Sequence, residues 1–153
     1  MDANYVNTFI DSFNHVMTQL GFSSIERGNL SVKGKVISAK GIILAVGLVG
    51  QLKGNVIYIM DKESAKKIAS KMMMGMPVDE LDDMAKSSLS ELSNMLSANA
   101  ATGFSKSGIL IDISPPSLLE GDEVNVTMSS EKVLGITLMA DGIPLEINIS
   151  LAG

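Results

Sequence analysis

Three side chains near the middle of the chain combine chemistry and spacing that suit contact with another molecule. Ser87, Glu91 and Asn94 offer a hydroxyl, a carboxylate and a carboxamide at intervals of four and three residues. On a helix, where each residue turns the side chain by about 100°, the three fall within one narrow band. Ala98 and Ala101 continue that band with small side chains. The pattern therefore predicts a polar pair beside a flat track, where the surface of another protein can come close.

Helix geometry alone also allows a plainer interpretation of the same residues. A Glu and an Asn three positions apart on a helix are usually solvated and make at most a weak mutual contact. Serine has a modest helix propensity, and we expect the serines at 90, 93 and 97 to face solvent. Taken by itself, the spacing favours an exposed polar face.

The composition disfavours several other kinds of functional site. The chain has no cysteine and a single histidine, His15, which leaves little for a zinc site or for Ser–His or Cys–His catalysis. The segment GLVGQLKG is rich in glycine but lacks the GK[ST] ending of a phosphate-binding loop. With 12 basic and 17 acidic side chains, the net charge is −5. An acidic chain without a basic cluster is a poor candidate for binding nucleic acid or an anionic membrane, so we expect a partner that brings its own positive groups.

The surrounding sequence predicts the elements that must position the polar pair. Periodic apolar residues predict a helix over 4–20, followed by a Ser/Gly-rich stretch, and a long helix over 78–104 that carries Glu91 and Asn94. Asp61 is a suitable N-cap for a short helix that stops at Gly75. Runs rich in valine and isoleucine predict strands over 35–40, 42–48, 51–60, 109–113, 124–128, 133–140 and 143–151. Because the strands come in hairpins rather than βαβ units, we expect an α+β fold with a largely antiparallel sheet packed against two long helices and a short one.

The apolar residues predict how these elements pack. The long helix is expected to face the sheet with Met84, Ala85, Leu89, Leu92, Met95 and Leu96. Methionines 72–74 and 76 are expected to fill gaps in the core, and the alternative is that they form an adaptable contact surface. The turn Asp141–Gly142 predicts a C-terminal hairpin, and Pro144 predicts that its last strand lies at a sheet edge or starts irregularly. An edge hairpin with an alternating apolar face predicts a homodimer.

The length of the chain is most simply explained by one domain over residues 1–153. A hydrophobic content of 46% is typical of a folded globular protein. The first residues lack the basic and apolar regions of a signal peptide, and the longest apolar stretch, GIILAVGLVG, is too short to span a bilayer. Together with the lack of cysteine, these features favour a cytoplasmic protein with no membrane partner.

The polar band also carries a resemblance to a known family. Ser87, Glu91 and Asn94, followed after 21 intervening residues by Pro116, resemble the signature of the CheC/CheX/FliY family of response-regulator phosphatases. That signature is Asp or Ser, three residues, Glu, two residues, Asn, and a proline roughly twenty residues later. The segments MDANYVN, MMMGMPVDELDDMAKSSLSELSNM and IDISPPSLLEG extend the similarity over essentially the whole chain, and it is greatest to the stand-alone CheX branch.

The resemblance implies that the protein dephosphorylates the aspartyl phosphate of a CheY-type response regulator. In this role Asn94 would orient the attacking water, and Glu91 would pair with the active-site lysine of the receiver. Ser87 would cap the helix or touch the partner at the rim, and we expect Pro116 to shape the loop after its strand. The chain would need no cofactor of its own, because Mg²⁺ is expected on the receiver and positioning supplies most of the catalysis.

A binding role without catalysis is the alternative. A module of the same superfamily could bind a phosphorylated receiver, or serve in the flagellar switch, without hydrolysing the phosphate. Family members with two active helices carry the Glu–Asn pair in each half. Here Asp11 and Asn14 of the first helix are also three apart, but Asp is shorter than Glu and no proline follows at the matching distance. We therefore expect one site per chain, with Asp11 and Asn14 on an exposed helix face.

Overall fold

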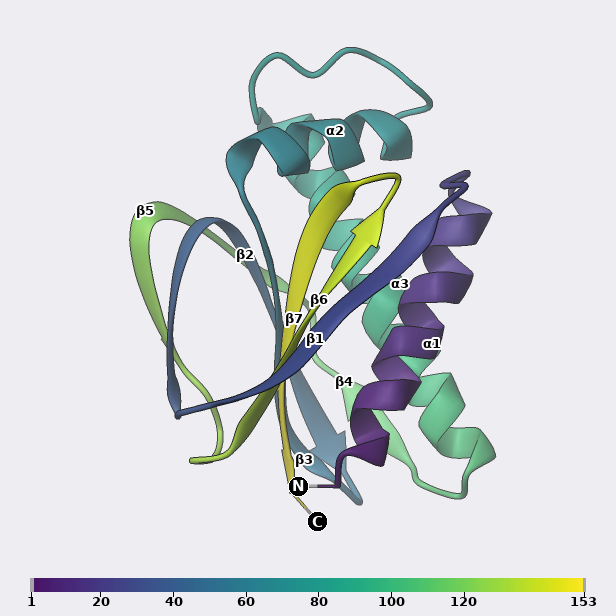
Figure 1. Ribbon diagram of the computed structural model, residues 1–153, viewed down its shortest axis with the longest axis vertical. Helices are drawn as coiled ribbons and strands as arrows, with labels where there is room; N and C mark the ends of the chain where they lie inside the picture. The colour runs from purple at the N-terminus through teal and green to yellow at the C-terminus, as the bar shows by residue number, and fades with distance from the viewer. Residues whose placement is uncertain (1, 153) are drawn as a thin grey trace.

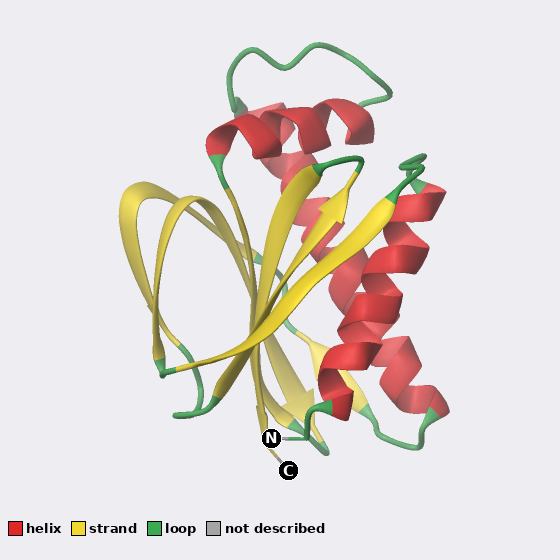
Figure 2. Ribbon diagram, viewed as in Figure 1, coloured by secondary structure: helices red, strands yellow, loops and turns green. Residues whose placement is uncertain are grey.

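The computed structural model describes residues 2–152 as three helices packed on a seven-stranded sheet (Figures 1 and 2). The helices are α1 (Asn4–Gln19), α2 (Lys62–Met72) and α3 (Asp83–Lys106). The strands are β1 (Ile25–Lys33), β2 (Val36–Gly50), β3 (Lys53–Met60), β4 (Ile111–Ile113), β5 (Ser117–Thr127), β6 (Val133–Ala140) and β7 (Ile143–Ala152). Every strand pairing is antiparallel, so the predicted α+β class and the two long helices with a short one are confirmed.

The strands follow the order β1-β6-β7-β3-β2-β4, and β5 also pairs with β2. β2 is a single strand of 15 residues, where the sequence predicts two strands over 35–40 and 42–48. The two halves meet at Gly41, whose φ is 106°, and the register against β5 shifts at the same point. A Cβ there would collide with the Met60 carbonyl oxygen, so this bend requires glycine. β2 and β5 curve together on the side away from α1 (Figure 1).

The C-terminal hairpin is confirmed, but its expected place at the sheet edge is wrong. Asp141 and Gly142 both have positive φ, 50° and 80°, as a two-residue hairpin turn requires. β7 pairs with β6 on one side and with β3 on the other, so it lies inside the sheet. Pro144 is accommodated because it is only the second residue of the strand. The hairpin thus offers no free edge for the predicted homodimer, which stays a prediction without this structural basis.

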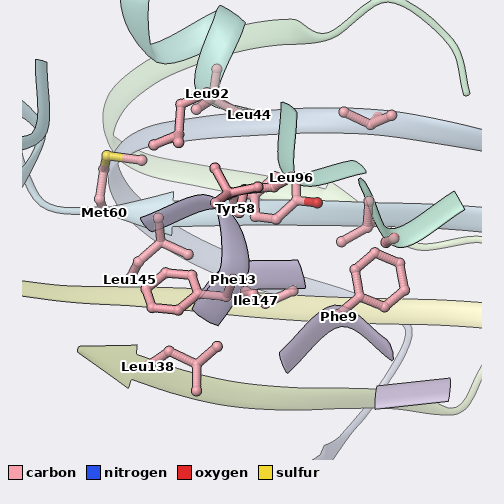
Figure 3. Close-up of a cluster of buried hydrophobic side chains, with 14 of the residues drawn as sticks. Phe9, Phe13, Leu44, Tyr58, Met60, Leu92, Leu96, Leu138, Leu145 and Ile147 are labelled. Carbon is pink, nitrogen blue, oxygen red and sulfur yellow. The ribbon is translucent and has the colours of Figure 1, made fainter. Parts of the chain in front are cut away.

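The main hydrophobic core fills the space between the sheet and the three helices (Figure 3). Phe9 and Phe13 enter it from α1, Tyr58 from β3 and Leu92 from α3, and none is more than 2% exposed. Alternate side chains of β7 face the same core: Leu145, Ile147, Ile149 and Leu151. Because Leu92 of α3 is buried in this core, the opposite side of the helix points away from the sheet.

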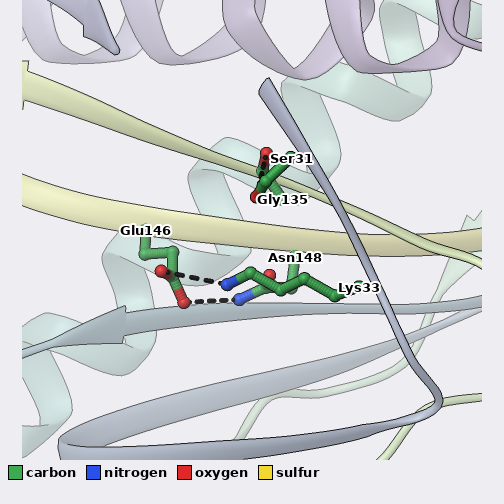
Figure 4. Close-up of polar contacts among 5 residues, drawn as sticks. All are labelled: Ser31, Lys33, Gly135, Glu146 and Asn148. Atoms are coloured by element: carbon green, nitrogen blue, oxygen red, sulfur yellow. Dashed lines mark hydrogen bonds and ion pairs between the residues drawn. The ribbon is translucent and has the colours of Figure 1, made fainter. Parts of the chain in front are cut away.

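A polar cluster lies on the opposite face of the sheet and ties the outer strand β1 to the interior (Figure 4). Lys33 Nζ lies 3.1 Å from a Glu146 carboxylate oxygen, and Asn148 Nδ2 donates to the other oxygen over 2.8 Å. The strand between them carries Gly135, where a Cβ would stand only 3.0 Å from Lys33 Cε. Glycine therefore leaves the space through which the lysine reaches β7.

Serines let α3 lie close to the sheet. Ser93 and Ser97, which the sequence predicts on the solvent side, are 0% exposed, so that prediction is wrong. The Ser93 hydroxyl donates to the Ser90 carbonyl over 2.7 Å, and the Ser97 hydroxyl lies 2.8 Å from the Tyr58 hydroxyl. Because both hydroxyls have partners, burial costs them little.

The start of α3 is set by a side-chain cap. The helix begins at Asp83, five residues after the predicted start near 78. Asp82 is the N-cap, and its carboxylate accepts a hydrogen bond from the Ala85 N–H over 2.9 Å. The cap therefore fixes the residue at which the helix begins, ahead of the turns that carry Ser87, Glu91 and Asn94.

Candidate functional site

A groove of about 450 Å³ opens between α3 and the connection from β4 to β5. Seven residues line it: Asp83, Lys86, Ser87, Ser90, Glu91, Asn94 and Pro116. Six come from the first half of α3, and the seventh directly precedes β5. The four residues of the sequence pattern therefore meet in one place, although the proline is distant in the chain.

The helix presents the members of the pattern at different depths. Ser87 and Glu91 are exposed, whereas Asn94 is half-buried. Leu89 and Leu92, on the other side of the helix, are at most 1% exposed and hold it on the sheet. Glu91 can therefore meet a charged group at the surface, while a molecule that touches Asn94 has to enter the groove.

Pro116 forms part of the groove wall, which goes beyond the loop-shaping role expected for it. Two residues earlier, the Ser114 hydroxyl accepts the N–H of Gly47 on β2 over 2.8 Å. The Ser114 N–H in turn donates to the Gly47 carbonyl over 2.9 Å. These two bonds attach the connection to the sheet and so hold Pro116 in the wall of the groove.

Three lining residues, Asp83, Lys86 and Ser90, lie outside the sequence pattern. Lys86 Nζ is 3.2 Å from a carboxylate oxygen of Glu120 on β5, and the two side chains are 34% and 33% exposed. The ion pair spans from α3 to β5 beside the groove. Lys86 directly precedes Ser87, and this position is the only hint of its role in the sequence. The sequence does not indicate that its partner, Glu120, comes from β5.

Ala98, Ala101 and Met84 differ in how well they match the predicted faces of α3. Ala98 is exposed one turn beyond Asn94, as expected, while Ala101 is half-buried in a separate hollow. Met84 is 62% exposed, so its predicted place in the core is wrong. Met84 precedes Glu91 by seven residues, and seven steps of about 100° bring a side chain to within about 20° of its starting direction. Met84 therefore lies on the same side of α3 as Glu91.

The methionines after α2 also depart from the prediction. Met74 is 97% exposed and Met76 57% exposed, so neither fills the core, whereas Met72 packs against it. The reason is the turn that ends α2, in which Met74 and Gly75 both have positive φ, 60° and 87°. The chain leaves the helix there and carries both side chains outward.

The pair on α1 is exposed, as predicted, but it does not form an equivalent site. Asp11 lines a groove of about 490 Å³ between α1 and α3, together with His15 and Lys106. Asn14 is exposed and is not among the residues that line this groove. Asp11 and Asn14 thus do not line one groove together, whereas Glu91 and Asn94 do.

Within residues 2–152, no three His, Cys, Asp or Glu side chains come together as the ligands of a metal ion would. Over the same part of the chain, no helix combines the length and the apolar character that crossing a bilayer requires.

Known proteins resemble this chain in sequence and in fold. The sequence profile of the family described as "Chemotaxis phosphatase CheX" matches residues 42–138. The "CheY-P phosphatase CheX" of Thermotoga maritima is 29% identical over 126 residues, which cover 82% of this chain and 81% of that protein. A CheX-CheY-BeF3-Mg+2 complex from Borrelia burgdorferi contains a chain that is 29% identical, with a TM-score of 0.82 and coverage of 97% and 98%.

A CheC-like superfamily protein from Shewanella sp. PV-4 has the same fold, with a TM-score of 0.86, 21% identity and complete coverage of both chains. The family profile covers more than half of the chain and includes Glu91, Asn94 and Pro116. The chain therefore belongs to the CheX family of chemotaxis phosphatases.

Proposed function

We propose that this protein hydrolyses the aspartyl phosphate of a CheY-type response regulator. The observation that carries the proposal is the single groove in which Ser87, Glu91, Asn94 and Pro116 meet. Membership of the CheX family supports the reaction. The relative named as a CheY-P phosphatase and the complex that contains CheY support the substrate.

Asn94 is the proposed catalytic residue. Its carboxamide can accept a hydrogen bond from a water without bringing a negative charge toward the phosphoryl group. The water oxygen attacks phosphorus, the bond from phosphorus to the aspartyl oxygen breaks, and the products are a free aspartate and inorganic phosphate. Because an acyl phosphate is already labile, alignment of the water supplies most of what catalysis needs.

Glu91 is the proposed docking residue. Its carboxylate is exposed, and Asn94 lies one turn further along α3. A lysine of the receiver that pairs with Glu91 would fix the register of the complex, so that the phosphoryl group arrives at Asn94. Ser87 and Ala98, exposed on either side, would contact the receiver at the rim, and Ala101 would lie at the far end of the contact.

The reaction is expected to take place in the cytoplasm, where phosphorylated receivers act. We place the Mg²⁺ on the receiver, so that this chain contributes only polar side chains and shape. The chain then acts by orienting a water and a partner, which agrees with the small number of histidines and the lack of cysteines.

The test is the decay of a radiolabelled, phosphorylated CheY-type receiver from the same organism, measured with and without this protein. We expect decay to accelerate in proportion to the amount of protein added. A protein that binds the receiver in its BeF3-Mg²⁺ form but leaves its decay unchanged would be a binding module, and the catalytic proposal would be wrong.

A further inference from the structure

Two exposed apolar side chains stand at opposite ends of the α3 face that carries Glu91 and Asn94. Met84 is 62% exposed in the first turn of the helix, and Leu110 is 64% exposed just after its last turn. Single exposed apolar side chains are common on protein surfaces, but those that border a polar site are well placed to contact a partner. Their position on either side of the candidate site calls for a common explanation.

Met84 belongs to the same stripe of the helix as the site. It precedes Glu91 by seven residues, which is two helical turns or about 10 Å. Its direction differs from that of Glu91 by only about 20°. Methionine is flexible and polarisable, so it adapts to the shape of an apolar partner surface.

Leu110 closes the other end of the same face. Its side chain lines a hollow of about 600 Å³ together with Ala101 of α3. Its backbone is held in place, because the Leu110 N–H donates to Gln51 Oε1 over 2.6 Å and the Leu110 carbonyl accepts the Gln51 N–H over 3.0 Å. The leucine is therefore presented to solvent on a fixed backbone, which lowers the entropy cost of binding to it.

We infer that Met84 and Leu110 are apolar anchors for the receiver and that the docking surface runs along α3 from one to the other, past Glu91 and Asn94. The inference rests on the proposed function, since it takes the receiver as the occupant. From Met84 to Ala101 the helix extends about 25 Å. A protein–protein interface of ordinary size, about 800 Å² on each side, has a similar span.

The charges and positions favour a receiver over a second copy of this chain. Glu91 lies between the anchors, and a symmetric dimer over this face would bring the two carboxylates toward each other. Such a dimer would also cover Asn94 and leave no space for a substrate. A receiver that offers a lysine to Glu91 and apolar surface on both sides of that lysine avoids the repulsion between carboxylates. It also brings its phosphoryl group to Asn94 instead of excluding a substrate.

The test compares Met84→Gln and Leu110→Gln with Met74→Gln. All three side chains are exposed, and glutamine is also a good helix former at the helical position 84, so the fold should be kept. Met74 is the matched control, because it is 97% exposed but lies in the turn after α2. Binding of each variant to the BeF3-Mg²⁺ form of the receiver is measured by titration, and hydrolysis is measured at limiting and saturating receiver concentration.

We expect Kd and KM to rise about fivefold or more for Met84→Gln and Leu110→Gln, as is usual for the loss of an interface anchor. The kcat should change little, and Met74→Gln should match the parent. Unchanged binding by both anchor variants would overturn the inference, and so would an equal loss for Met74→Gln. A change of oligomeric state in the anchor variants would instead assign the face to a second copy and would also overturn it.

The outcomes also separate this inference from the proposed function. If the parent binds the receiver through Met84 and Leu110 but does not accelerate hydrolysis, the anchors stand and the catalytic proposal fails. If the parent accelerates hydrolysis and the anchor variants have the parent's KM, the catalytic proposal stands and the anchors fail.

Discussion

The Tyr58 hydroxyl on β3 and the Ser97 hydroxyl on α3 lie 2.8 Å apart in the core, and each is the other's hydrogen-bond partner. Tyr58 is 1% exposed and Ser97 is 0% exposed. Ser97 follows Asn94 by about one helical turn, so this bond ties the helix of the candidate site directly to a central strand. A rigid scaffold of this kind is what a positioned catalytic amide needs.

Tyr58→Phe should destabilise the protein, because it leaves the buried Ser97 hydroxyl without its partner. We expect the free energy of unfolding to fall by about 1–3 kcal/mol. Adding Ser97→Ala should cost less than the sum of the two single changes, since both ends of the bond are then gone. Denaturant unfolding of the two single variants and the double variant measures this, and strictly additive losses would show that the two hydroxyls do not interact.

The same tyrosine predicts a dependence of stability on alkaline pH. Burial raises the pKa of the Tyr58 phenol far above its ordinary value of 10.0, and the hydrogen bond with Ser97 offsets only part of that effect. A raised folded pKa means that the folded state favours the neutral phenol. The neutral Tyr58 phenol therefore contributes fully to the free energy of unfolding below about pH 10. This contribution declines as the pH rises from there toward the folded pKa. Above pH 10 the parent should lose stability more steeply than Tyr58→Phe, and parallel curves would contradict this.

The ion pair between Lys86 and Glu120 should help to hold the groove open at the correct width. Lys86→Glu and Glu120→Lys each place like charges together, so we expect slower receiver hydrolysis from both. Exchanging the two residues restores the attraction and should recover most of the rate. Hydrolysis assays of the two single variants and the exchanged variant test this. If the exchanged variant is as slow as the single ones, Lys86 acts directly on the partner instead of through Glu120.

Glu91→Lys should abolish receiver binding without harming the fold. The side chain is exposed, so thermal unfolding should be nearly unchanged. Two like charges would then face each other in the complex, and affinity should fall more than about tenfold. Glu26→Lys, an exposed charge reversal on the distant outer strand β1, is the matched control. Equal binding by parent and Glu91→Lys would remove Glu91 from the docking role.

The sequence predicts the elements that have strong periodicity or turn chemistry. The hairpin at Asp141–Gly142 follows from residues that favour positive φ, and the long helix follows from its leucine spacing. β1 escapes prediction because it is an outer strand whose segment, IERGNLSVK, has no buried residue and no alternation. Pattern analysis detects strands by their buried face, so an exposed strand gives little signal.

The sequence indicates the residues of the candidate site but not their surroundings. Glu91, Asn94 and Pro116 are picked out by their resemblance to the family signature, while Lys86 needs Glu120, whose place depends on the register of β5. The buried Ser97 was misjudged because its partner, Tyr58, comes from a strand 39 residues away. Burial of a polar residue depends on tertiary partners, which local sequence does not reveal.

The central claim is that Asn94 orients the attacking water. Asn94→Ala should keep the helix, because alanine is the better helix former and the side chain lies outside the core. It should also keep Glu91 free to dock. Asn99→Ala, which removes another half-buried amide from the same helix but on the side of the α1 groove, is the matched control.

The most direct measurement is single-turnover release of phosphate from a labelled receiver, made beside a binding titration with its BeF3-Mg²⁺ form. For Asn94→Ala we expect the rate to fall about a hundredfold or more while Kd stays near the parent value, since the lost interaction forms mainly in the transition state. Asn99→Ala should behave like the parent in both measurements. An Asn94→Ala protein that releases phosphate as fast as the parent would contradict the account.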